Sequence, residues 1–293
     1  MRASLVALIL WAMPAVAEPK LEHIGTFVWD RPEDYFGGWS AIEVLDGGDV
    51  FLAIGDNAQS YRGTLERDGD VIVGVPRRPV GALQDLDGIA FFRKPATNEK
   101  KIADSEGMAL LSDGNYAVSF ERNDRIFVYD GDTAFVRMPD IIDAQRLPKN
   151  QGVEALAVDL EGRLIAIPET APKGASGIPV WRLEGEKWST LFHIRRTQGF
   201  RPVGADIGPD GQLFLLERAF RLIGFQSRIR VFDLKTPDAL GDAIWQPPMR
   251  AFDNLEGISV WQDKVGSTRI TMISDDNHQS VQETQIVEFR LTE

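Results

Sequence analysis

The sequence repeats one pattern with a period of about 50 residues, and this repeat restricts the fold more than any other feature. In the fullest copy, residues 106–122, a Glu-Gly pair opens a short strand, an Asp-Gly turn follows, and a second acid comes where the next strand ends. Further copies begin at Glu154 and Glu256, and weaker ones at Ser40 and Val203. A period of this length is enough for one four-stranded blade.

The repeat predicts an all-β chain that folds as a single β-propeller. Five copies are evident. Residues 59–104 contain one more segment, beginning with an Asp-Gly pair, that resembles the first half of a repeat but lacks the second half, and this leaves room for a sixth blade. No segment keeps apolar residues at helical spacing over four turns. We expect an N-terminal strand at 21–29 to close the ring beside the C-terminal strand at 285–291, because an open ring would leave unpaired sheet edges.

The first 17 residues have the pattern of a secretory signal peptide. Arg2 is followed by an apolar run at 5–11 and by the small-residue sequence Ala15-Val16-Ala17. We predict cleavage after Ala17, one propeller domain over residues 18–293, and a periplasmic or secreted location. No later segment has 18 consecutive apolar residues, so no transmembrane segment is expected.

Charge and cysteine content exclude several classes of function. The formal net charge is −12, which argues against nucleic acid as a partner because binding to phosphates requires a basic face. The chain has no cysteine, which excludes disulfides, thiolate metal sites and a cysteine nucleophile. The acidity is compatible with cation binding, and it also has the simpler interpretation that it keeps an exported protein soluble. The oligomeric state stays open.

The repeated acids predict a site at one opening of the propeller channel. If each Glu-Gly pair begins an inner strand, its carboxylate lies at the same opening as the second acids, and so many carboxylates need a cation, arginines or protons to offset their repulsion. Calcium suits a site made of oxygen ligands alone. The predicted catalytic residues are Glu106, Glu154 and Glu256, and the predicted metal ligands are Glu121, Glu169, Asp275 and Asp276.

A purely structural interpretation of the same pattern remains open. The acids would then accept hydrogen bonds from a neighbouring blade, and each adjacent glycine would relieve crowding where the blades converge. Arg122 and Arg218 follow acids of the repeat and are predicted to bind an anionic substrate group, although they could instead pair with those acids. His278 follows an Asp-Asp-Asn sequence and could lie near the opening, but a surface position is the simpler interpretation.

The order and spacing of these motifs resemble the phytase-like domain family, described as "esterase-like activity of phytase", over roughly residues 35–290. The resemblance rests on Ser40-Ala41-Ile42 with Gly55-Asp56-Asn57, Asp104-Ser105-Glu106-Gly107 with Glu121-Arg122, Gly152-Val153-Glu154 with Pro168-Glu169, and Leu255-Glu256-Gly257 with Ser274-Asp275-Asp276-Asn277. It implies an exported β-propeller distantly similar to calcium-dependent propeller phytases. The chain has Asn57 where the family often has an arginine, and its fourth copy lacks the first acid.

These observations lead to one predicted function and two alternatives. The first is a Ca²⁺-assisted hydrolase that acts on a small anionic or ester substrate, either a phosphoester or another ester. The first alternative is a non-catalytic propeller of the cell envelope that binds a ligand or a protein. The second is a metal-dependent lactonase, in which the metal polarises a lactone carbonyl.

Overall fold

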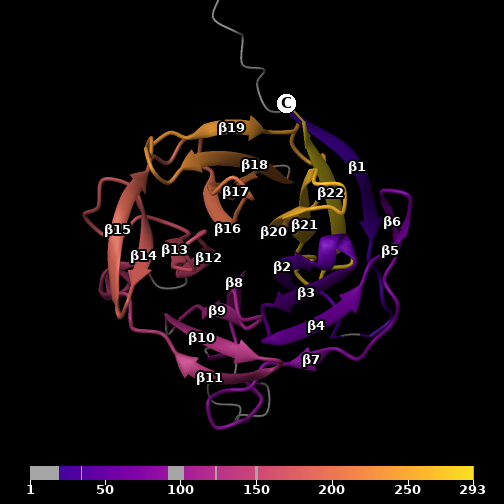
Figure 1. The fold of residues 1–293 in the computed structure, drawn as a ribbon, viewed down its shortest axis with the longest axis horizontal. Coiled ribbons are helices and arrows are strands. Elements are labelled where there is room, and N and C mark those ends of the chain that lie inside the picture. The colour runs from indigo at the N-terminus through magenta and orange to yellow at the C-terminus, as the bar shows by residue number, and fades with distance from the viewer. Residues whose placement is uncertain are drawn as a thin grey trace, which may run out of the picture.

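The computed structural model describes residues 20–33, 35–91, 102–122, 124–148, 151–222 and 224–292, so the expected signal peptide lies outside the described residues. Five four-stranded antiparallel sheets form the blades of a ring (Figure 1). We number the blades in chain order by their innermost strands: β2 (Trp39–Leu45), β8 (Ser105–Leu110), β12 (Val153–Val158), β16 (Arg201–Ile207) and β20 (Leu255–Gln262).

The second strand of each blade runs antiparallel to the inner one and is mostly buried on both faces, as expected for a strand enclosed between neighbouring sheets. These strands are β3 (Val50–Gly55), β9 (Tyr116–Phe120), β13 (Leu164–Pro168), β17 (Gln212–Arg221) and β21 (Thr268–Ser274). The third strands are β4 (Gln59–Thr64), β10 (Arg125–Asp130), β14 (Ile178–Glu184), β18 (Gly224–Asp233) and β22 (Gln285–Thr292). The outer strands are β7 (Gly81–Ala82), β11 (Thr133–Arg137), β15 (Lys187–Ile194), β19 (Asp242–Trp245) and β1 (Lys20–Val28).

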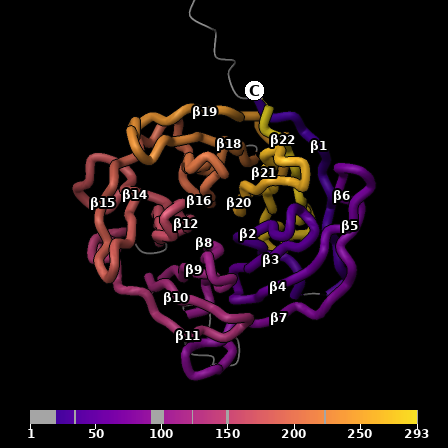
Figure 2. Tube along the Cα trace, in the orientation of Figure 1, coloured from indigo at the N-terminus to yellow at the C-terminus, as the bar shows by residue number. Residues whose placement is uncertain are grey.

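The ring closes where the N-terminal strand joins the last blade, which confirms the expected closure. Strand β1 pairs antiparallel with β22 from Lys20 opposite Thr292 to Val28 opposite Gln285, and the two strands run side by side in Figures 1 and 2. Just after β1, the Trp29 ring stacks on Trp39 of blade 1 with centroids 5.2 Å apart. The first and last parts of the chain therefore share one aromatic core.

The described residues form five blades and no sixth four-stranded sheet. Residues 59–104 instead supply β4 and β7 of blade 1 and a separate hairpin, β5 (Glu66–Asp68) with β6 (Val71–Gly74). Two short 3-10 turns, η1 (Asp46–Gly48) and η3 (Ile142–Arg146), lie within the described part of the chain. None of the helices described is long and apolar enough to cross a membrane.

The hydrophobic core is divided among the spaces between blades. Five clusters of buried side chains occur, and each combines residues from two adjacent sheets. Between blades 4 and 5, for example, Val203 and Leu216 pack with Ile258 and Ile270. Because apolar burial holds the blades to one another, the polar side chains on the inner strands are left to line the channel.

Candidate functional site at the channel rim

Every inner strand carries a β-bulge at the same place. The pairing with the second strand shifts between Trp39 and Ala41, Ser105 and Met108, Val153 and Ala155, Pro202 and Gly204, and Leu255 and Gly257. A bulge leaves one residue unpaired and re-aims its side chain. We call the residues in these bulges the first positions of the rim: Ser40, Glu106, Glu154, Val203 and Glu256.

A second set of rim residues lies beside these bulges, where the second strand passes the start of the inner strand. In four blades the backbone N–H of this residue donates to the carbonyl oxygen two residues before the first position, with N···O distances of 2.8–3.0 Å. In blade 4 the equivalent residue, Arg218, pairs with Arg201 in the ladder between β16 and β17. These second positions are Asp56, Glu121, Glu169, Arg218 and Asp275.

The glycine after the first position is required by close approach of the blades. A Cβ atom added to Gly204 would lie 2.4 Å from the carbonyl oxygen of Glu256, and one added to Gly257 would lie 2.8 Å from the Cα of Ala41. Real Cβ atoms do not approach backbone this closely, so the expectation that these glycines relieve crowding agrees with the structure. The same crowding brings the first positions of neighbouring blades together.

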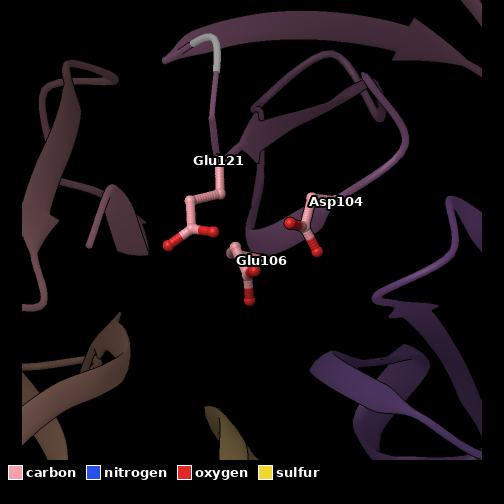
Figure 3. A group of neighbouring side chains, drawn as sticks. All are labelled: Asp104, Glu106 and Glu121. Atoms are coloured by element: carbon pink, nitrogen blue, oxygen red, sulfur yellow. The ribbon is translucent and has the colours of Figure 1, made fainter. Parts of the chain in front are cut away.

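Three carboxylates of blade 2 form the tightest group on the rim (Figure 3). Asp104, Glu106 and Glu121 each offer an oxygen atom such that all three atoms lie within 4.8 Å of one another. Asp104 precedes β8 and was not among the predicted site residues. The repeat gave no signal for it, because two residues before the first position the other copies have Gly38, Gly152, Arg201 and Asn254.

Two of the first-position acids, Glu106 and Glu154, have raised pKa values. The pKa of Glu106 lies well above its usual range because of burial and then because of the charges of Glu154 and Glu256. The pKa of Glu154 is likewise raised, by burial and then by Glu169 and Glu256. Glu106 and Glu154 are enclosed by protein but keep some exposed surface through the mouth of the channel, and neither accepts a hydrogen bond from the residues that the structure describes.

Three of the second-position acids also have raised pKa values. Burial, with the charge of Asp104, raises the pKa of Glu121 to about 7. Burial, with the charge of Glu256, raises the pKa of Asp275 to about 8. Burial also raises the pKa of Asp56 to about 6, against the opposing effect of His278. A cation at the rim would relieve this repulsion between carboxylates.

The two predicted substrate-binding arginines already have acidic partners. Arg122, in a turn with φ of +63°, donates from Nε to Asp104 at 2.6 Å. Arg218 donates to Glu256 and to the side-chain oxygen of Asn254, the latter at 2.6 Å. Pairing with acids, the structural alternative for these residues, is therefore present, although the side chain of Arg218 remains 23% exposed at the rim.

Two acids of the repeat point away from the rim. The Asp276 carboxylate accepts hydrogen bonds from the backbone N–H groups of Gly38 and His278 and from the Thr284 hydroxyl, so it fixes a loop beside the rim rather than facing the channel. Glu217 is fully buried and accepts from Arg228 and Arg230. Of the predicted metal ligands, Glu121, Glu169 and Asp275 lie on the rim, and Asp276 lies outside it.

His278 is exposed, as the simpler interpretation of the sequence expected, and its ring also lies close to Asp56 of the rim. Its Nε2 atom is 3.8 Å from an Asp56 carboxylate oxygen and 3.3 Å from the Asn57 side-chain nitrogen. Both His278 and the preceding Asn277 have φ of +49°. Consecutive residues in the left-handed region are uncommon outside glycine, and such strained backbone concentrates at functional sites.

A second pair of carboxylates lies deeper in the channel, three residues after the first positions of blades 1 and 4. Glu43 accepts from the Ser259 hydroxyl at 3.2 Å and from the backbone N–H of Leu110 at 3.4 Å. Asp206 accepts from the backbone N–H of Val260 at 2.5 Å. These bonds join inner strands of different blades, which is the structural role that the sequence left open for the repeated acids.

The donor set at the rim fits a hard divalent cation. The ligands available are oxygen atoms only, which is the preference of calcium and magnesium. Asp104, Glu106 and Glu121 bring three carboxylates close enough to share one ion. Burial, and then the charges of neighbouring acids, raise the pKa values of Glu106 and Glu121. Arg122, whose Nε is 2.6 Å from Asp104 and 3.8 Å from Glu121, offsets only part of this effect.

Comparisons with solved structures agree with the propeller fold. A PQQ-bound aldose sugar dehydrogenase from Streptomyces coelicolor shares 13% identity at a TM-score of 0.51, over 94% of this chain and 99% of that one. A protein of unknown function from Dyadobacter fermentans shares 14% identity at a TM-score of 0.52, over 92% of this chain and 98% of that one. At such identities the likeness shows the fold alone. No curated protein matches the chain.

The family comparison is more specific than these structural likenesses. The profile described as "Phytase-like: Esterase-like activity of phytase" matches residues 34–278, which include all ten rim positions. This match confirms the resemblance seen in the motifs. The chain therefore belongs to the phytase-like family of β-propellers.

Proposed function

We propose that the rim binds a divalent cation, calcium by preference, and hydrolyses an anionic ester, with a phosphoester as the leading substrate class. The observation that carries the proposal is the group of three carboxylate oxygens from Asp104, Glu106 and Glu121, all within 4.8 Å of one another. Membership of a family described by esterase-like activity supports hydrolysis as the reaction.

Each part of the rim would have a separate role. Asp104, Glu106 and Glu121 would hold the cation, while Arg122 fixes the orientation of Asp104 through its 2.6 Å hydrogen bond. Calcium, when bound there, would supply positive charge beside the substrate oxygens. Arg218 is the second-position residue with a positive charge, and it would bind the anionic group of the substrate.

Glu154 is the residue best placed to orient the attacking water. Its carboxylate lies among the rim acids and accepts no hydrogen bond from the described residues, so its oxygens are free to accept one from water. In hydrolysis the water oxygen bonds to phosphorus, the bond between phosphorus and the alcohol oxygen breaks, and that oxygen gains a proton. Glu256, which pairs with Arg218, would position the arginine rather than the water.

Thermal unfolding with chelator and then with added calcium tests the metal site. A ligand that binds only the folded state at 100 times its Kd stabilises it by about 2.7 kcal/mol. We expect calcium to raise the melting temperature of the wild type, and we expect Glu106→Gln to remove the increase. Glu186→Gln is the matched control, because Glu186 is exposed in a turn of blade 3, away from the rim.

Turnover of 4-nitrophenyl phosphate and of 4-nitrophenyl acetate then tests the reaction. Calcium-dependent release of 4-nitrophenol from the phosphate, lost in Glu154→Gln, would support the proposal. Release from the acetate alone would move the substrate class to carboxylic esters. Calcium binding without turnover of either would favour the non-catalytic binding propeller, and no response to calcium or magnesium would remove the metal site.

A further inference from the structure

A groove beside the rim differs from the rim in its chemistry. It is a cavity of about 660 Å³ whose walls include Tyr35, Asn57, Gln59, Val80, Ala82 and His278. A volume of this size is typical of small-molecule sites. None of the described residues that line the groove has a carboxylate, an ammonium or a guanidinium group, whereas the rim beside it is densely acidic.

The groove is continuous with the rim through Asp56. The Asn57 side chain donates to an Asp56 carboxylate oxygen at 2.9 Å, and His278 lies 3.8 Å from the same oxygen. From this inner wall the groove extends outward along blade 1 to Ala82 on the outer strand β7. A substrate held at the rim therefore has a neighbouring space into which its organic part can extend.

The lining of the groove favours a flat apolar group. The side chain of Tyr35 is 58% exposed, so its ring is accessible to a ligand in the groove. Val80 and Ala82 add apolar surface, and aromatic rings stack favourably against a tyrosine ring. The polar atoms of Asn57 and His278 lie at the inner end, beside the rim.

A second depression near the rim is a weaker candidate for the same role. It has an exposed apolar side chain in Leu222, but it is also lined by Arg250, Asp253 and Glu283. Burying an apolar group there would also remove water from charged side chains, which is costly. The described lining of the groove beside Asp56 has no charged group that would add such a cost.

We propose that this groove binds an aromatic group of the substrate, so that the preferred substrates are aryl or arylalkyl esters whose anionic part lies at the rim. The inference rests on the proposed function for the anionic part and extends it by naming the organic part. Tyr35 would stack on the aromatic ring, and Ala82 would leave the space that the ring occupies.

Binding of two non-hydrolysable phosphonates, measured by calorimetry with calcium present, tests the proposal. We expect phenylphosphonate to bind the wild type at least tenfold more tightly than methylphosphonate. Tyr35→Ala, which removes the stacking partner, and Ala82→Phe, which fills the groove, should each abolish this difference without changing methylphosphonate affinity. Leu222→Ala is the control and should keep the difference. Thermal unfolding of each variant shows whether it is folded.

The outcomes separate the groove from the rim. Equal affinity of the wild type for the two phosphonates would overturn the groove while leaving the rim proposal intact. If neither phosphonate binds, the rim proposal fails, and saturation-transfer NMR with the neutral probe benzyl alcohol still tests the groove. Loss of the benzyl alcohol signal in Ala82→Phe would support the groove, and an unchanged signal would overturn it. Loss of the difference in Leu222→Ala would place the aromatic group in the second depression.

Discussion

Blades 2 and 4 contain the same Glu-Arg dipeptide near the end of the second strand, but the structure uses it in opposite ways. In blade 2, strand β9 ends at Phe120, and Glu121 follows it onto the rim. In blade 4, strand β17 continues to Arg221, so Glu217 stays within the sheet and Arg218 takes the rim position. The dipeptide is shifted by one residue between the two blades, which moves each side chain to the opposite side of the strand.

The two glutamates, Glu217 and Glu121, are expected to have opposite effects on the stability of the fold. The Glu217 side chain has no exposed surface and accepts hydrogen bonds from Arg228 and Arg230 at 2.7–2.9 Å. Glu121 has mainly carboxylates around it, and its pKa is raised to about 7 by burial and by Asp104. We therefore expect the same residue type to stabilise blade 4 as part of an ion-pair network and, in the absence of a cation, to destabilise blade 2.

Glu217→Gln should cause the largest change in stability. It would leave two buried guanidinium groups without their carboxylate, and removing one partner of a buried ion pair costs about 3–5 kcal/mol. Urea unfolding should show a loss of this size, equal in chelator and in calcium. Glu186→Gln should change the free energy of unfolding by less than about 0.5 kcal/mol, as exposed substitutions do. A loss below 1 kcal/mol would show that the arginines find other partners.

Glu121→Gln should change stability in the opposite direction. In the folded wild type the pKa of Glu121 is about 7, against a usual value of 4.5, and at pH 8 the side chain is ionised. Ionising it therefore costs more free energy in the folded protein than in the unfolded chain, and glutamine removes this cost. We expect a gain of about 1–3 kcal/mol in the free energy of unfolding in chelator at pH 8. The calcium-induced stabilisation should be lost in the same variant. A loss of stability comparable to that of Glu217→Gln would contradict the proposed difference between the two blades.

The sequence was sufficient to predict the ring and most of the rim. Acids that repeat at one place of a strand-turn-strand unit require a common environment, so the placement of Glu106, Glu154 and Glu256 at one opening follows from the repeat alone. The number of blades did not follow, because the described part of residues 59–104 forms two strands of blade 1 and a separate hairpin in place of another repeat. Asp104 could not be recognised, since no acid occurs at its equivalents.

The position of Arg218 was predictable from spacing. The second acids of blades 2 and 3 follow the first by 15 residues, and 15 residues after Val203 is Arg218 rather than Glu217. Residue type alone pointed to Glu217 as the rim acid. The length of β17 could not be predicted from the spacing of the repeat. The strand continues past the rim because it pairs with β18 over ten residues.

Arg218→Gln should have a smaller effect, on ligand binding rather than on folding. We expect methylphosphonate to bind about tenfold more weakly in calcium, which corresponds to about 1.4 kcal/mol. Arg122→Gln should weaken phosphonate binding less and change calcium affinity more, because Arg122 contacts Asp104 and Arg218 does not. Calorimetric titration of both ligands into both variants measures the difference. Equal loss of phosphonate binding in the two variants would assign both arginines to the anion.

The smallest expected effect is on the pH dependence of stability, and it involves a carboxylate of blade 4 that lies deeper in the channel than the rim. At the place of Ala109 in blade 2, blade 4 has Asp206, whose pKa is raised to about 7 by burial. Burial and the charge of Asp206 also raise the pKa of Glu43. Both pKa values are higher in the folded protein, so the protonated forms of Glu43 and Asp206 favour folding. Their contribution to the free energy of unfolding is complete below about pH 4 and is lost as the pH rises through 7.

Glu43→Gln should therefore flatten the pH dependence of folding. In chelator, the wild type should lose stability between pH 5 and pH 8, and the variant should lose less, since one of the two buried carboxyl groups can no longer ionise. The difference between the two curves isolates the channel pair, because the rim acids are common to both proteins. Glu186→Gln should follow the wild-type curve. If Glu43→Gln also follows it, the channel pair does not hold a proton in the folded state, and the pH dependence arises from the rim alone.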